Sequence, residues 1–201
     1  MKPTKTTTKT PTFDFQLSDG ENRLGELILH ISRRCQTSPT FGATKLNKIL
    51  WCADFLAFAE TGRPITGVQY MRIPNGPVPR RLLPVRSKLE AAGSLAVETV
   101  MLRSGYPQKR TVALRKADLS AFTAEQIEIV DRVIVALSEK NAKGVSRMSH
   151  GKAWEAAGGD QELIPYEAAF LSDEKNTLED KMRTKELARK FGWPRLERVA
   201  A

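Results

Sequence analysis

The chain has 201 residues and a formal net charge of +9, and 41% of its residues are hydrophobic while 27% are charged. These values are typical of an ordinary globular protein with one main domain, and no run approaches the roughly 18 consecutive apolar residues that a membrane-spanning helix needs. The N-terminus lacks the apolar segment of a secretory signal, and the two cysteines, Cys35 and Cys52, form no CxxC pair. We therefore expect a cytoplasmic protein with reduced cysteines and no membrane contact.

The first twenty residues differ in composition from those that follow. Residues 1–20 are rich in threonine and lysine and bury little, which predicts a flexible N-terminal tail. Residues 23–34 place apolar side chains on one helical stripe and predict the first helix. We expect this helix to open a domain that covers residues 21–170.

Residues 44–61 form an unusually apolar helical stretch. Its aliphatic residues recur at helical spacing on one face, and they are Leu46, Ile49, Leu50, Ala53 and Ala57. Thr44 is a candidate N-cap, and Gly62 is placed to end the helix in a left-handed conformation. We expect this helix at the centre of the domain, with Lys45 and Lys48 on its exposed side.

A strand and a stiff corner follow the central helix. Residues 65–73 alternate apolar and polar side chains, which indicates a strand. In the next stretch, Pro74-Asn75-Gly76-Pro77-Val78-Pro79, the prolines fix φ and Gly76 can adopt backbone angles closed to other residues. This corner is either a surface shaped for a partner or a simple turn of the chain. Pro84 predicts that a helix begins near it, since proline is tolerated in a first helical turn.

A β-hairpin and further helices complete the predicted domain. Residues 95–102 and 110–114 predict the two strands of the hairpin. Thr123 and Gln126 fit a capping box that begins a long helix, and shorter helices are expected after it. The fold class is therefore mainly α with a small antiparallel β-sheet (α+β), with a single-domain helical core and a β-hairpin.

Two features near the end of the chain add to this prediction. His150 and Trp154 are four residues apart, so we expect their side chains to contact each other. Residues 171–201 are heavily charged with a thin apolar line, which predicts a charged C-terminal helical extension.

Basic residues are concentrated between residues 80 and 116, where nine lysines and arginines stand against two glutamates. Such a surface attracts an acidic protein or a nucleic-acid backbone, and it is equally compatible with a solvated face that has no dedicated partner. If residues 123–157 form a helix-turn-helix, the chain is a nucleic-acid-binding transcriptional regulator. The basic side chains that would then contact nucleic acid are Arg103, Lys109, Arg110, Lys143 and Arg147.

Several motifs, in order along the chain, resemble the Panacea domain, the SocA-like antitoxin domain of bacterial and phage toxin–antitoxin systems. The residues that carry this resemblance are Lys45 to Asp54, Gly62 with Tyr70, Gly76-Pro77-Val78-Pro79, Phe122-Thr123, Ser149-His150 and Trp154. The resemblance implies a mainly helical domain without a catalytic centre or cofactor. It also implies that the protein neutralises a cognate toxin by direct binding. Motifs of phosphate loops, dinucleotide sites, zinc proteases and serine hydrolases are absent from the sequence, which agrees with a non-enzymatic protein.

Together, the resemblance and the residues give an expected partner-binding surface around the corner. Its expected members are Lys45, Lys48, Trp51, Tyr70, Asn75, Gly76, Pro77, Val78, Pro79, Arg80 and Arg81. The expected partner is a toxin protein encoded next to this chain. DNA and a second copy of the chain stay open as further partners.

Overall fold

The computed structural model describes residues 17–102 and 105–171, together with residues 177–179, 182, 185, 186 and 189. The chain divides into two compact units, residues 1–171 and 172–201. Residues 1–16 of the predicted tail lie outside the described residues, as does most of the predicted C-terminal extension. In the second unit, the described residues from Leu178 onward are helical.

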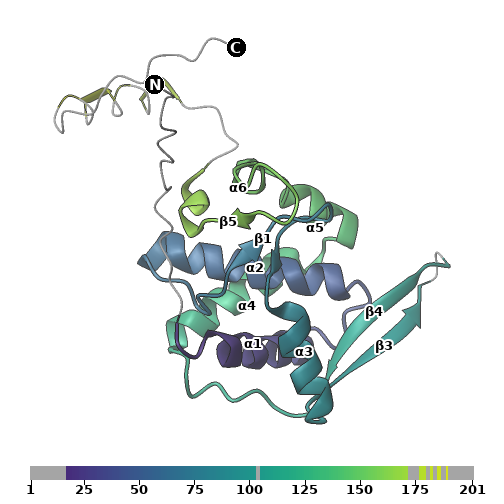
Figure 1. Ribbon diagram of the computed structural model, residues 1–201. Helices are drawn as coiled ribbons and strands as arrows, with labels where there is room; N and C mark the ends of the chain where they lie inside the picture. Colours follow the sequence, from purple (N-terminus) through teal and green to yellow (C-terminus); the bar gives the residue numbers. More distant parts are fainter. Residues whose placement is uncertain are drawn as a thin grey trace, which may run out of the picture. The chain divides into compact units, whose positions relative to one another are not determined.

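Helices form the body of the first unit (Figure 1). α2 (Ala43–Thr61) runs through its middle and contacts α1 (Gly20–Arg34), α4 (Ala124–Ser138) and α5 (Ala142–Met148). The core consists of side chains from all of these helices and from the short strands, and the fully buried ones include Leu24, Ile28, Phe41, Ile49, Leu50, Ile65 and Tyr70. The predicted central position of α2 is thus confirmed.

The two ends of α2 test the capping predictions. Gly62 follows the helix with φ +74 and its N–H bonds to the carbonyl of Phe58, so the predicted left-handed end is confirmed. The predicted Thr44 cap is wrong, because the helix begins at Ala43 and Thr44 already lies inside its first turn. Gly42 occupies the cap position and offers no side-chain acceptor.

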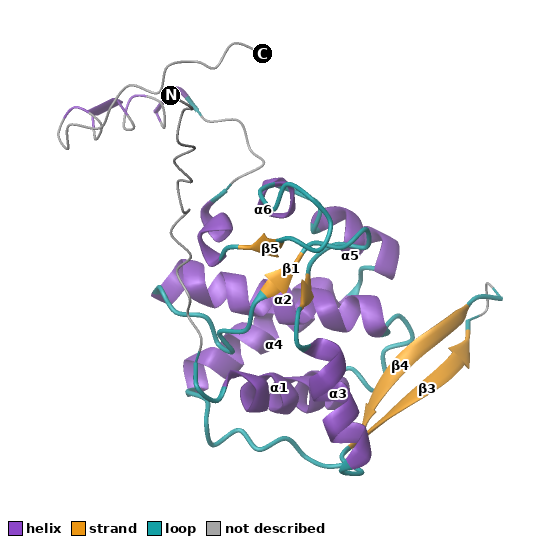
Figure 2. Cartoon of the chain, viewed as in Figure 1, coloured by secondary structure: helices purple, strands orange, loops and turns teal. Residues whose placement is uncertain are grey.

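A small three-stranded antiparallel sheet lies against α2, and its strand β1 crosses in front of this helix in Figure 2. Its central strand β1 (Tyr70–Met71) pairs with β2 (Val78–Pro79) and with β5 (Leu163–Ile164). The predicted strand over residues 65–73 is much shorter than expected. Thr66 explains part of the difference, because its backbone N–H bonds to the carboxylate of Asp54 and not to a neighbouring strand.

The β-hairpin is confirmed and projects from the helical body (Figure 2). β3 (Leu95–Met101) and β4 (Pro107–Ala113) form a separate antiparallel sheet, in which Leu95 pairs with Ala113 and Met101 with Pro107. α3 (Leu82–Ala91) precedes the hairpin and begins two residues before Pro84, which therefore lies in the first turn.

The remaining helices are short except for α4. The predicted capping box of α4 is present, with Thr123 accepting from the Gln126 N–H and the Gln126 side chain accepting from the Thr123 N–H. α5, α6 (Lys152–Glu155) and the 3-10 helix η1 (Tyr166–Phe170) follow. The predicted fold class, mainly α with small antiparallel sheets, is confirmed. Within the described part of the chain, no helix is both long and apolar enough to span a membrane.

Candidate binding site

The corner, residues 74–79, follows β1, includes β2 at its end and depends on a glycine. Gly76 has φ +95, as its predicted role requires. A Cβ atom on Gly76 would lie 2.2 Å from the Nζ of Lys48 and 2.5 Å from the Oγ of Ser149. Both the backbone angle and the lack of space therefore require glycine at this position.

Four backbone carbonyls at the corner each accept a hydrogen bond from a side chain of another segment. The pairs are Trp154 Nε1 to Ile73 at 3.2 Å, His150 Nε2 to Pro74 at 2.9 Å, Ser146 Oγ to Asn75 at 3.1 Å and Lys48 Nζ to Pro77 at 3.3 Å. The N–H of Gly76 also bonds back to the Ile73 carbonyl at 2.8 Å. Together these bonds restrict the corner to one conformation, and the Pro77 carbonyl, which is buried, would be costly to leave without a partner.

The expected exposure of Lys45 and Lys48 is wrong. Their exposed fractions are 2% and 1%. Lys45 donates to the Thr40 hydroxyl at 2.7 Å and to the Ser138 carbonyl at the end of α4 at 2.9 Å. Burial lowers the pKa of Lys45, and it lowers the pKa of Lys48 to about 8. Through these buried hydrogen bonds, Lys45 links α2 to Thr40 and to the end of α4, and Lys48 links α2 to the corner.

Tyr70, also expected at the partner surface, is buried at 1% exposure. Its hydroxyl donates to the carboxylate of Asp54 at 2.8 Å, and the Thr66 N–H and hydroxyl donate to the same carboxylate. Burial raises the pKa of Asp54 despite these bonds. Burial, together with the nearby Asp54 carboxylate, raises the pKa of Tyr70 well above its usual value. This cluster fixes β1 and the segment before it onto α2.

Trp51 is only partly buried. Its ring lies 5.3 Å from that of Phe55, centroid to centroid. The indole N–H of Trp51 is buried and has no acceptor among the described residues. Trp51 therefore contributes mainly to the packing of α2, and only part of its side chain is accessible to a partner.

The part of the corner that reaches the surface is smaller than expected. Gly76, Pro77, Val78 and Pro79 are buried, whereas Pro74 and Asn75 are exposed. We call Pro74 and Asn75 the rim of the corner. A partner that approaches the corner meets this rim.

A pocket of about 430 Å³ lies beside the rim and is lined by residues from three segments. α2 contributes Thr44, the rim contributes Asn75, and α5 with the following turn contributes Ala142, Lys143, Ser146, Arg147 and His150. We call it the basic pocket. The structure thus brings Lys143 and Arg147, expected to contact nucleic acid, next to Asn75, expected to contact a protein.

Part of the basic region of residues 80–116 is paired with acids within the molecule. Arg81 bonds to Glu21 at 2.7 Å, and Lys88 reaches the same carboxylate at 3.4 Å. Arg115 bonds to Glu26 at 2.6 Å. Arg110 donates to backbone carbonyls, Arg80 donates to the Gln69 side chain at 3.2 Å, and Arg103 lies outside the described residues. A local surplus of positive charge in the sequence is therefore reduced by acids from α1.

The helix-turn-helix interpretation of residues 123–157 meets a geometric obstacle. The expected recognition element, α5, has seven residues, and its Ser146 and the adjoining Ser149 face the corner. His150 and Trp154 contact each other as predicted, with centroids 4.5 Å apart in an edge-on arrangement, but they do not share a helix, because α5 ends before His150 and α6 begins after it. α5 thus braces the corner with one face.

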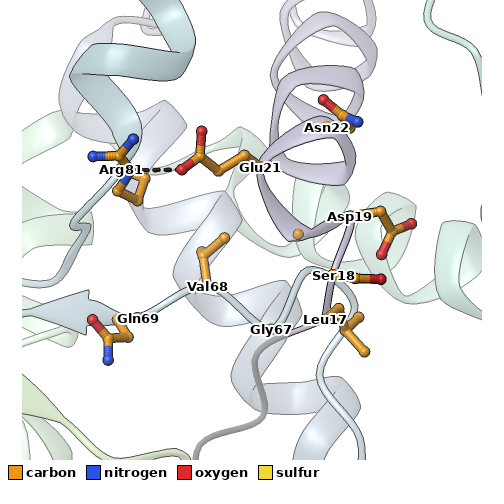
Figure 3. Close-up of a pocket in the computed structure, with 10 residues that line it drawn as sticks. Leu17, Ser18, Asp19, Glu21, Asn22, Gly67, Val68, Gln69 and Arg81 are labelled. Atoms are coloured by element: carbon orange, nitrogen blue, oxygen red, sulfur yellow. Dashed lines mark hydrogen bonds and ion pairs between the residues drawn. The ribbon is translucent and has the colours of Figure 1, made fainter.

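A second, larger pocket of about 540 Å³ lies at the start of α1 (Figure 3). Figure 3 shows Asp19 at the N-cap of α1 and Asn22 on its first turn, with Gly67 and Gln69 on another segment of the pocket lining. The ion pair between Glu21 and Arg81 closes one side. The charged groups of this pocket are therefore partly satisfied by each other.

Sequence reasoning missed the donors that brace the corner. Ser146, His150 and Trp154 recur every four residues, and this spacing was the one available signal. For His150 and Trp154 it indicated a contact with each other, whereas the target that all three share lies about 70 to 80 residues earlier in the chain. No grouping of three or more histidine, cysteine or acidic side chains suited to a metal occurs within the described residues.

Comparison with known proteins adds one finding. A family model described as "Antitoxin SocA-like, Panacea domain" matches residues 46–155, which is more than half of the chain. No curated protein and no solved structure gives a significant match. The matched region includes α2, the corner, the hairpin, α4 and α5.

Proposed function

Since this protein belongs to the SocA-like Panacea family of antitoxins, we propose that it neutralises a toxin protein by binding it directly at the rim of the corner. The observation that carries this proposal is the bracing of the four corner carbonyls by side chains from α2, α5, α6 and the turn before α6. A surface held in one conformation loses little conformational entropy when it docks, so more of the contact energy appears as affinity.

We also propose that the protein has no catalytic activity of its own. Support comes from the titratable groups that lie nearest the corner. Lys48 is bonded to a backbone carbonyl, and Asp54 and Tyr70 are bonded to each other. All three are buried and contribute to packing, and His150, the titratable group at the rim itself, is engaged by the Pro74 carbonyl.

The test is co-expression with the reading frame that lies beside this gene. The neighbouring protein should arrest growth when expressed alone and should be harmless, and co-purify, when this chain is present. Asn75→Arg should abolish both effects, because it places a large charged side chain on the exposed rim without touching the braced carbonyls. Ser87→Arg is the matched control, since it adds the same side chain to the exposed surface of α3.

The outcomes test separately whether the protein neutralises the toxin and whether the rim is the binding surface. A neighbour that is harmless alone, or that stays toxic with the wild-type chain, contradicts direct neutralisation. If the wild-type chain protects and Asn75→Arg protects equally well, the function stands and the rim is excluded from the interface.

A further inference from the structure

The basic pocket carries two cations that the molecule itself does not neutralise. Lys143 and Arg147 are exposed, and the structure gives neither an ion pair nor a hydrogen bond with any described residue. Elsewhere on the surface, Arg81, Arg115 and Arg132 each lie within 2.7 Å of a carboxylate. No aspartate or glutamate lines the basic pocket. Its positive potential is therefore available to a ligand.

The arrangement on α5 places these cations side by side. Lys143 and Arg147 are four residues apart on one helix, so their side chains lie on the same face. Like charges at this spacing repel each other and destabilise an isolated helix. An anion between them would remove that repulsion and would gain charge-assisted hydrogen bonds from both.

We propose that the basic pocket receives an acidic side chain of the toxin, held by Lys143 and Arg147 while the toxin backbone or side chains lie on the rim. This inference rests on the proposed function and names the chemistry of the partner at that site. The guanidinium of Arg147 can bind both oxygens of a carboxylate, and Lys143 supplies a point charge beside it. Thr44, which also lines the pocket, supplies a hydroxyl from α2.

The structure favours a protein carboxylate over a nucleic-acid phosphate. Duplex binding needs a row of cations that follows successive phosphates. Arg81, Lys88 and Arg115 of the basic region cannot lengthen the pocket into such a row, because they are paired with acids of α1. A compact pocket with two cations beside a rigid rim suits one acidic side chain of a folded partner.

The test is charge reversal in the full chain, using the neighbouring toxin as the probe. Lys143→Glu with Arg147→Glu should weaken toxin binding by about 100-fold or more, because attraction is replaced by repulsion within the interface. The control, Arg63→Glu with Lys116→Glu, makes the same change in charge at exposed positions outside the pocket and should alter the affinity by no more than about threefold, as expected for remote surface charges. Circular dichroism melting of both variants checks that the fold is intact.

A charge swap then identifies the acid. One aspartate or glutamate of the toxin, changed to lysine, should restore binding to the Lys143→Glu/Arg147→Glu variant and weaken binding to the wild type. If the pocket variant binds like the wild type, or if the control loses as much affinity, the inference is overturned while neutralisation by the wild type still stands. If the wild type does not bind the toxin, the proposed function fails and this inference fails with it.

A second arm uses a labelled duplex from the region upstream of the gene. At about 0.15 M salt, where screening is physiological, we expect the two charge-reversal variants, which lose the same net charge, to bind the duplex equally weakly. Loss of duplex binding in the pocket variant, with toxin binding retained, would assign the pocket to phosphate and overturn the proposal.

Discussion

Gly76 shows how much of the corner could be predicted from a single residue. Its need for an unusual φ was readable from the sequence, because the prolines of the corner fix φ and glycine adopts backbone angles that are closed to other residues. The burial of Lys48 beneath it was not readable. The carbonyl that Lys48 binds belongs to Pro77, which lies 29 residues away, and local periodicity holds no information about such a contact.

Replacing Gly76 should be far more costly than replacing another glycine with positive φ. Gly76→Ala must strain the backbone and also displace the Lys48 amine, so we expect a loss of about 3–4 kcal/mol in the free energy of unfolding. Gly62→Ala is the control, because Gly62 has φ +74 and open space around it, and it should lose about 1–2 kcal/mol. Urea unfolding of both variants measures the difference. Equal losses would show that Lys48 moves aside without cost.

Lys48 should also make stability depend on pH. Its folded pKa of about 8 lies below the value of about 10.4 expected in the unfolded chain. Between these values the unfolded chain binds more protons than the folded protein, so the free energy of unfolding rises with pH across this window. Below pH 8 both states are protonated and the full cost of burying the charge is present.

Comparison with Lys48→Met isolates this contribution. From about pH 7.5 to about pH 9.5, the wild type should gain about 1–2 kcal/mol relative to Lys48→Met. Lys116→Met, at an exposed site, should follow the wild type throughout. Parallel curves for the wild type and Lys48→Met would mean that the buried amine titrates normally.

Among the elements, the helices were predicted better than the strands. α2 and α4 carry their own signals, namely an apolar face, a terminal glycine and a capping box. The strand over residues 65–73 was predicted too long. Alternation of apolar and polar side chains indicates which residues are buried, but it does not indicate which residues pair with a neighbouring strand. The N–H of Thr66 bonds to the Asp54 carboxylate, and within this segment only Tyr70 and Met71 pair with neighbouring strands.

The hairpin is attached to the body through Arg110, which was expected to contact nucleic acid. Its guanidinium donates to the carbonyls of Gln36 at 2.9 Å and Ser38 at 3.1 Å, between α1 and α2. Arg110→Ala should destabilise the protein by about 1–3 kcal/mol, since both carbonyls lose a charged donor. Amide hydrogen exchange in β3 and β4 should accelerate with it.

Lys109→Ala is the matched control for the hairpin. Lys109 is the neighbouring residue on β4 and is exposed, so its removal should leave stability and exchange within experimental error of the wild type. If Arg110→Ala behaves like this control, the hairpin is held by its strand packing alone.

At the scale of the whole molecule, the family resemblance and the fold class were correct, whereas the distribution of charge was not. A count along the sequence finds a basic segment at residues 80–116, but Glu21 and Glu26 of α1 lie against it in space. The family match ends at residue 155, yet β5 supplies the third strand of the small sheet through Ile164. The folded unit is therefore larger than its recognisable motif.

The bracing of the corner has a consequence for how this protein can change over generations. All four supporting bonds end on backbone carbonyls, which every amino acid possesses. A mutation that alters the side chain of Asn75 therefore leaves its own support intact. Single substitutions in the rim can therefore adapt the protein to a new toxin, while the hydrogen bonds that support the corner stay the same.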